Sequence, residues 1–262
     1  MAERNDVPHK IAEVLRALIG KNKKKYFTSA LILAAGSSTR MGDGVSKQFL
    51  SICGIPVVAR TIMPFDRSEF IDEIIVVCKK DEIGMYDGFA EKYNLTTPIK
   101  VVEGGATRQE SARFGSDAVD PKSRYIAIHD AARCLITEEM IARVCHSAFT
   151  SRDKGAILAI KATDTVKIAD KNAFIDSTPE RKFVWQAQTP QVFPLNAYRA
   201  AAYIARDEEI DGTDDASLLE HIKFPVKLVE GSRENIKVTE PVDVLFAEAI
   251  LNSRKSSGGD EK

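Results

Sequence analysis

The sequence has little of what a disulfide-rich, membrane-spanning or nucleic-acid-binding protein needs. Its 262 residues include four cysteines and no Cys-x-x-Cys pair, so neither a disulfide framework nor a zinc site is expected. No apolar run approaches the length needed to span a bilayer. Lysine and arginine number 37 against 38 acidic residues, which gives a formal net charge of -1. We therefore expect a cytoplasmic protein with no nucleic-acid or membrane partner, whose anionic substrates are met by local charges.

The length suits one large α/β domain, which we place at residues 28–252. Residues 1–27 are predicted to be an amphipathic extension, because apolar residues recur at helical spacing from Ile11 to Ile19 before a lysine-rich end. This extension contains acidic residues and lacks the apolar core of a signal peptide, which argues against a targeting role. Residues 253–262 are rich in serine, glycine and charge, and we expect them to be disordered.

Apolar, strand-like segments alternate with helix-like segments along the domain. Buried strands are predicted at residues 30–35, 71–78, 99–102, 124–128, 155–160 and 226–231, and helices at residues 56–62, 104–119, 196–205 and from Pro241 onward. The alternation predicts an α/β fold with a Rossmann-like, mostly parallel twisted sheet and helices on both faces. Ligands are expected at the carboxyl ends of its strands.

The loop after the first strand matches neither of the common phosphate-binding motifs. A Gly-x-x-x-x-Gly-Lys-Ser/Thr sequence is absent, and Gly36 begins no Gly-x-Gly-x-x-Gly, so neither a P-loop NTPase nor a dinucleotide fold is indicated. The small and hydroxyl-bearing residues after Ala35 still allow backbone N–H groups to cradle phosphate oxygens. Arg40 and Lys47 add cations suited to a transferring phosphoryl group. The alternative is a small-residue turn with surface cations.

Four later residues add to the case for a nucleotide site. Gly104 and Gly105 follow a strand and permit close approach of a ligand, although an ordinary glycine turn with a helix cap has the same pattern. Asp130 ends another strand, where a carboxylate beside phosphates is a natural ligand for Mg²⁺. The neighbouring His129 is given no role. Lys237 is a third candidate cation, against the alternative of a solvated surface lysine.

Several short motifs occur in the order and spacing found in nucleotidyltransferases that join CTP to a sugar or polyol phosphate. They are Ala-Ala-Gly-x-Ser-x-Arg-Met-Gly with Lys-Gln-Phe, Gly-Gly-x-x-Arg-x-x-Ser, His-Asp-Ala-Ala-Arg, Asp-Thr, Gln-Thr-Pro-Gln and Asn-Ile-Lys-Val-Thr. Over roughly residues 28–251 the sequence resembles the 2-C-methyl-D-erythritol 4-phosphate cytidylyltransferase family. It departs from the family at Ala106, where many relatives have an acidic residue, and at Cys134, where the family has proline.

The resemblance implies transfer of the cytidylyl group of CTP to 2-C-methyl-D-erythritol 4-phosphate, with release of pyrophosphate, in non-mevalonate isoprenoid biosynthesis. It implies three catalytic cations, a nucleotide site, an acceptor site and Mg²⁺ on Asp130. The catalytic residues would be Arg40, Lys47 and Lys237; the nucleotide-binding residues Ala34, Ala35, Gly36, Ser37, Gly104, Gly105, Ala106, Ser111 and Asp130; and the acceptor-binding residues Arg133, Thr165, Arg181, Thr189 and Thr213.

A polar hairpin at residues 164–177 has too little apolar surface to stand alone. The resemblance makes it part of an arm, at about residues 163–185, that reaches across a homodimer and completes the partner's site. Two alternatives stay open at this point. One is a ribitol 5-phosphate cytidylyltransferase, and the other is a non-catalytic nucleotide-binding relative. The Ala-Ala-Gly-x-Ser form of the first loop and the pair Asp164-Thr165 favour the 2-C-methyl-D-erythritol 4-phosphate enzyme over the ribitol 5-phosphate enzyme.

Overall fold

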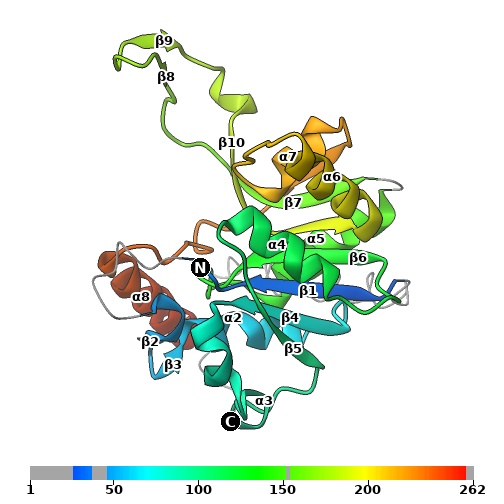
Figure 1. Cartoon of the computed structure of the whole chain (residues 1–262). Coiled ribbons are helices and arrows are strands. Elements are labelled where there is room, and N and C mark those ends of the chain that lie inside the picture. The colour runs from blue at the N-terminus through cyan, green and yellow to red at the C-terminus, as the bar shows by residue number, and fades with distance from the viewer. Residues whose placement is uncertain (1–25, 37–45, 152–153, 258–262) are drawn as a thin grey trace.

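The protein, described here from a computed structural model, is built on one seven-stranded sheet (Figure 1). The structure describes residues 26–36, 46–151 and 154–257. In spatial order the strands are β11 (Val226–Glu230), β7 (Gly155–Lys161), β10 (Trp185–Pro194), β6 (Tyr125–Asp130), β1 (Thr28–Leu33), β4 (Glu73–Cys78) and β5 (Ile99–Glu103). Every pairing in this sheet is parallel except those of β10, so the predicted fold class is confirmed.

The interior strand β1, which pairs with β4 on one side and β6 on the other, has all six residues buried. Its side chains alternate between the two faces of the sheet. Ala30 and Ile32 join one apolar core cluster, and Leu31 and Leu33 join another. An unbroken apolar run is therefore required here, since both faces of the strand are covered.

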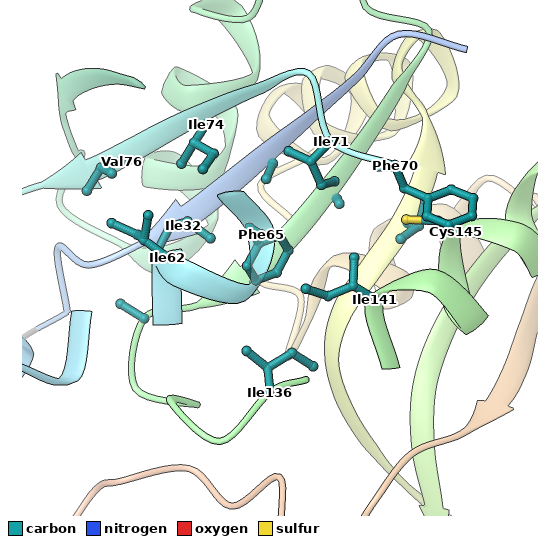
Figure 2. Packing of buried hydrophobic residues seen from close by; sticks show 14 of the residues in the cluster. Ile32, Ile62, Phe65, Phe70, Ile71, Ile74, Val76, Ile136, Ile141 and Cys145 are labelled. Carbon is teal, nitrogen blue, oxygen red and sulfur yellow. The ribbon is translucent and has the colours of Figure 1, made fainter. Parts of the chain in front are cut away.

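Helices cover both faces of the sheet, as predicted. On one face, α2 (Val57–Asp66) packs against β4, and α5 (Glu138–Thr150) packs against β7, β10 and β11. Figure 2 shows Ile62 and Phe65 of α2 close to Ile32. On the other face lie α4 (Arg108–Asp117), α6 (Leu195–Asp207) and α7 (Asp215–His221). Residues 80–92, after β4, form the 3-10 segment η3 (Lys80–Tyr86) and the single-turn helix α3 (Phe89–Lys92).

The antiparallel strand β10 was not predicted. It contains Pro190, which cannot donate to a ladder hydrogen bond and therefore argues against a central strand. The sheet accommodates this proline because the register of β10 against β7 shifts between Ala187 and Gln191. The insertion of β10 between β6 and β7 brings residues 187–191 next to the carboxyl end of β6.

The predicted hairpin is present but shorter than expected. It consists of β8 (Ile168–Ala169) and β9 (Ile175–Ser177), followed by the 3-10 turn η4 (Arg181–Phe183). Figure 1 shows it extending away from the body of the molecule. The large side chains of Phe174 and Phe183 are each 73% exposed. Within the subunit, the hairpin thus gains no stability from burial of these rings.

The last helix, α8 (Pro241–Ser257), packs on the small hairpin of β2 (Ser51–Ile52) and β3 (Ile55–Pro56). It continues past Ser253, so the predicted start of a disordered tail is wrong for residues 253–257. Arg254 explains the extension, since it pairs with Glu234 at 2.9 Å and donates to the carbonyl oxygen of Leu135 at 3.1 Å. Residues 258–262 and the N-terminal extension up to residue 25 lie outside the described residues. Where the chain is described, no helix has the length and apolar character to cross a membrane.

Candidate active site

Two loops meet over the carboxyl end of β4. The N–H of Ala34 donates to the carbonyl oxygen of Val77 at 2.7 Å, and the N–H of Gly104 donates to that of Cys78 at 2.8 Å. A Cβ atom on Gly104 would lie 2.6 Å from the Cβ of Ala35 and 2.8 Å from Ser111 Oγ. Glycine is therefore required at position 104. These four predicted nucleotide-binding residues, Ala34, Ala35, Gly104 and Ser111, lie together.

The glycine loop is held by the first turn of α4. Ser111 Oγ accepts from the N–H of Gly105 at 3.0 Å and donates to the carbonyl oxygen of Thr107 at 2.8 Å. The carboxylate of Glu110 accepts from the N–H of Ala106 at 2.7 Å. Although position 106 has no acidic side chain, the backbone of the loop is still held there by the carboxylate of Glu110. Ser111, nearly buried, positions the loop.

The turn that carries Lys47 is joined to the same region. It forms the 3-10 segment η2 (Lys47–Phe49), in which Gln48 is buried. The side-chain amide of Gln48 donates to the carbonyl oxygen of Ala34. Because one residue links both segments, Lys47 lies beside the loop that follows β1. Arg40, Ser37 and the other loop residues 37–45 lie outside the described part of the chain, and Gly36 is its last residue before that gap.

Asp130, at the end of β6, is the centre of a cluster of cations. Its Oδ2 lies 2.8 Å from Lys237 Nζ and 4.0 Å from Arg133 Nε, and its Oδ1 accepts from Arg108 Nε at 3.2 Å. Burial alone would raise the pKa of this carboxyl, but Arg108, Lys237 and Arg133 together hold the pKa well below its usual range. Asp130 is accordingly a carboxylate that stays ionised and fixed in place.

Arg108 also binds a second carboxylate. Its Nη2 lies 2.8 Å from Oδ2 of Asp215, in the first turn of α7, and the other oxygen of Asp215 accepts from the Tyr198 hydroxyl at 3.2 Å. Burial raises the pKa of Asp215, and the nearby Asp130 adds to this rise. Arg108 lowers the pKa of Asp215, but it does not offset the effect of burial. Burial opposes the charge on Arg108, but the two acids raise the pKa of its guanidinium above the ordinary value. Arg108 therefore joins α4, β6 and α7 at one point.

The buried imidazole of His129 has a positioning role. Its Nδ1 lies 2.9 Å from Thr189 Oγ1, and its Nε2 lies 3.2 Å from the carbonyl oxygen of Arg133. Burial lowers the pKa of His129 to about 3, so the ring is neutral near pH 7. The hydroxyl of Thr189 also accepts from the N–H of Asp130 at 3.2 Å. His129 and Thr189 thus fix the backbone on both sides of the Asp130 carboxylate.

The segment that carries Lys237 is anchored on β10 and on Arg133. Asn235 donates from Nδ2 to the carbonyl oxygen of Thr189 at 3.0 Å, and its own carbonyl oxygen accepts from Arg133 Nη1 at 2.8 Å. Gln188 Nε2 donates to the carbonyl oxygen of Ser232 at 2.8 Å. These bonds explain how a lysine from the end of the domain reaches a carboxylate in its middle.

A pocket of about 250 Å³ opens at this cluster. Five predicted site residues line it together, namely Asp130, Arg133, Thr189, Thr213 and Lys237. Five lining residues were absent from the predicted site, namely Arg108, Ala187, Gln188, Gln191 and Asp214. Arg108 and Gln188 belong to two of the family motifs, but the local sequence does not indicate that both residues lie in the pocket with Asp130.

The two predicted acceptor-binding residues of the arm do not line this pocket. Arg181 Nη1 donates to the carbonyl oxygen of Thr163 at 2.9 Å, and both Thr165 and Arg181 are exposed. Within one subunit, they therefore lie on a projecting element and not at the Asp130 cluster.

Comparison with known proteins places this arrangement in a family. Residues 28–253 match the family model described as 2-C-methyl-D-erythritol 4-phosphate cytidylyltransferase. The chain belongs to this family. It is 43% identical over 224 residues to the enzyme of that name from Caldanaerobacter subterraneus subsp. tengcongensis, covering 85% of this chain and 98% of the relative. It is 34% identical over 235 residues to the chloroplastic enzyme of Oryza sativa subsp. japonica, covering 90% and 78%.

The same similarity holds in three dimensions. The crystal structure of 4-diphosphocytidyl-2C-methyl-D-erythritol synthase from Anaerococcus prevotii superposes with a TM-score of 0.78 at 34% identity, covering 87% of this chain and 96% of that one. The family inferred from the motifs is thereby confirmed. The chain is a cytidylyltransferase, and its reaction is the CTP-dependent synthesis of 4-diphosphocytidyl-2-C-methyl-D-erythritol in isoprenoid biosynthesis.

The carboxylates of the cytidylyltransferase site bear on how a metal ion could be held there. Over the described ranges, no group of three or more His, Cys, Asp or Glu side chains is arranged to hold one. Asp130 supplies a single carboxylate, which in the structure pairs with Lys237 and Arg108. Mg²⁺ in nucleotide sites takes one or two carboxylates and completes its octahedron with phosphate oxygens and water. The residues present therefore fit a metal that arrives with the nucleotide.

Proposed function

We propose that the Asp130 pocket is where the triphosphate of CTP meets the phosphate of the polyol acceptor. The observation that carries this proposal is the convergence of Arg108, Arg133 and Lys237 on one ionised carboxylate beside a pocket of about 250 Å³. The acceptor phosphate is itself an anionic nucleophile near neutral pH. The site thus needs no strong general base, and its task is alignment and neutralisation of charge.

Lys47, Lys237 and Arg40 are the catalytic cations of this proposal. Lys237 is 39% exposed and lines the pocket, so its ammonium group is accessible to a phosphate oxygen. Lys47 approaches from the turn that Gln48 fastens to the carbonyl oxygen of Ala34. Charge on the five-coordinate phosphorus and on the leaving pyrophosphate would be stabilised by such preorganised cations.

The cytosine ring would lie at the two loops over β4. The close contact of Gly104 with Ala35 supports this, since a Cβ atom on Gly104 would collide with Ala35 and Ser111. Small residues at these loops would leave room for the edge of a pyrimidine, whereas a purine would need more space. Gly36 and Ser37 would continue the site toward the phosphates, and Gly105, Ala106 and Ser111 would complete it on the side of α4.

The acceptor would bind at Arg133, Thr189 and Thr213, with Thr165 and Arg181 supplied by the arm of a second subunit. The exposed Phe174 and Phe183 support a homodimer, because an arm with uncovered aromatic rings is expected to pack on another surface. In a two-fold dimer each arm can lie over the partner's pocket, so that both sites are completed by one self-complementary contact.

Mg²⁺ would be held by Asp130 and would supply charge neutralisation and a template for the phosphate oxygens. We place the enzyme in the cytoplasm. Support for this location comes from its four cysteines, which all lie in the described residues and form no disulfide, as a reducing compartment would keep them.

The deciding experiment is release of pyrophosphate from CTP and Mg²⁺ with 2-C-methyl-D-erythritol 4-phosphate, compared with ribitol 5-phosphate. We expect turnover with the first acceptor and little with the second. Equal or better turnover with ribitol 5-phosphate would overturn the acceptor assignment. No turnover with either would favour a non-catalytic relative. Replacing CTP by ATP in the same assay tests the pyrimidine site, where comparable rates would contradict the proposed fit.

A further inference from the structure

Outside the pocket, a glutamine side chain joins α4 to the chain segment that leads into α7. Gln109, the second residue of α4, uses both ends of its amide. Its Nε2 donates to the carbonyl oxygen of Ile210 at 3.0 Å, and its Oε1 accepts from the N–H of Gly212 at 3.0 Å. The partners are 101 and 103 positions away in the sequence, so these are tertiary bonds and not part of a helix cap.

The segment that Gln109 binds runs between the end of α6 and the N-cap of α7. The carboxyl end of α6 is closed by the bond from the N–H of Ile210 to the carbonyl oxygen of Ala205 at 2.7 Å. Asp214 then caps α7 and accepts from Gln191 Nε2 at 2.7 Å. Gln109 supplies the attachment between these two points.

Thr213 lies directly between the attachment points. Gly212 before it is held by Gln109, and Asp214 after it is held by Gln191. Thr213 also lines the Asp130 pocket, together with Arg133 and Thr189. The backbone on either side of Thr213 therefore determines where its side chain stands in the acceptor half of the pocket.

We infer that Gln109 is a positioning residue that fixes residues 210–212 so that the Thr213 hydroxyl faces the phosphate of the polyol acceptor. This inference rests on the proposed function, which places the acceptor at Thr213. Gln109 itself does not line the Asp130 pocket. Its effect is exerted through the two backbone bonds, and it contributes no atom to the reaction.

The chemistry of the side chain explains why glutamine is needed. The segment offers one free acceptor and one donor to α4, and an amide supplies the matching donor and acceptor in one plane. A carboxylate would accept from Gly212 but place a second oxygen against the carbonyl of Ile210. A methionine has similar length but neither polar group. Loss of both bonds would leave the segment free to sample several positions, at a cost to acceptor binding.

CTP binding should not be affected by loss of the two Gln109 bonds. The bonds that shape the nucleotide loops run from Gly104 to Cys78 and from Gly105 to Ser111, and none of them involves Gln109. A KM that rises for the acceptor alone, with CTP affinity intact, is thus the signature of positioning. A general structural defect would weaken both ligands.

The test uses the full chain with Gln109→Met, which keeps the aliphatic stem. We expect the acceptor KM to rise about tenfold, a change equal to the loss of one to two hydrogen bonds, while the Kd of CTP measured by calorimetry changes less than about twofold. Tyr203→Phe is the matched control. It removes the bond from α6 to Asp117 at the far end of α4, 3.0 Å long, and should leave both constants unchanged.

A double variant identifies the route of the effect. If Gln109 acts through Thr213, the Gln109→Met, Thr213→Val protein should have an acceptor KM within about twofold of Thr213→Val alone. Multiplied effects would overturn the inference, as would a normal acceptor KM in Gln109→Met when Thr213→Val raises it. Equal loss of CTP and acceptor affinity would reduce Gln109 to a structural residue. An unchanged KM in Thr213→Val would instead remove Thr213 from the acceptor site, and both the placement and the inference would fall.

Discussion

The cluster around Asp130 and the arm that carries Arg181 are built in opposite ways. Asp130 is bonded to α4, to β10 and to the segment before α8, and its side chain is 10% exposed. Arg181 donates within its own arm, to the carbonyl oxygen of Thr163, and is exposed. One region is determined by many tertiary contacts. The other is determined by local ones.

This difference has a functional meaning for the cytidylyltransferase. Charge neutralisation around a triphosphate requires groups that need no rearrangement when the reaction occurs, and in the proposed site the ion pairs around Asp130 would provide them. We propose that the arm takes part in recognition of the acceptor; it extends away from the body of the molecule, and its rings are exposed in its own subunit. The two halves of the site should therefore respond differently to substitution and to dissociation of subunits.

The largest expected effect is on the cation cluster. Lys237→Ala should lower the turnover number by about 10²–10³, because one preorganised charge contact to the transition state is lost. CTP binding should weaken far less. Steady-state kinetics and calorimetry give the two quantities, and Lys227→Ala, an exposed lysine on β11, is the control. Near-normal turnover in Lys237→Ala would remove this lysine from the mechanism.

A smaller effect is expected from the arm. Arg181→Ala should raise the KM for the acceptor by about tenfold or more, as for loss of a charge-assisted hydrogen bond, and leave CTP affinity nearly unchanged. The neighbouring Lys182→Ala, whose ammonium pairs with Glu180 at 2.6 Å, should have little effect and serves as the control.

Mixing two impaired variants tests whether the arm acts across a dimer. Arg181→Ala protein combined with Lys47→Ala protein should regain activity at low acceptor concentration, because a heterodimer would contain one site with both residues intact. Subunit exchange must be verified by mass spectrometry of the mixture. Exchange without recovery would mean that the arm serves its own subunit.

The smallest effect is the pH dependence of stability. The lowered pKa of Asp130 means that its stabilising contribution is present above the unfolded value, about 4, and is lost as pH falls below it. The raised pKa of Asp215 has the opposite sign, since its protonated form is favoured in the fold and stability declines as pH rises above about 4.

Urea unfolding of Asp130→Asn and Asp215→Asn between about pH 3 and 7 separates these contributions. The stability of the native protein relative to Asp130→Asn should decrease as pH falls. Relative to Asp215→Asn it should increase. If the stability difference from the native protein changed with pH in the same direction for both variants, the opposite pKa shifts of Asp130 and Asp215 would be wrong.

Much of the sheet could be predicted because the information is local. The apolar run of β1 is buried on both faces, and its burial follows from composition alone. The absence of β10 from the prediction has an equally local cause. Pro190 is a signal against a strand, and only the register shift against β7 makes room for it. The tail from Ser253 is predicted to be disordered because its residues are polar, whereas in the structure Arg254 pairs with Glu234 and the helix continues.

The sequence by itself determined that a carboxylate, Asp130, would end a buried strand, and that cations and small-residue loops would lie at strand ends. Only the tertiary structure decided which cations meet that carboxylate. Arg108 begins α4 and Asp215 begins α7, and their pairing depends on these two helices lying on the same face of the sheet. The electrostatic interaction of two side chains depends on their separation in space, and local sequence carries no measure of that distance.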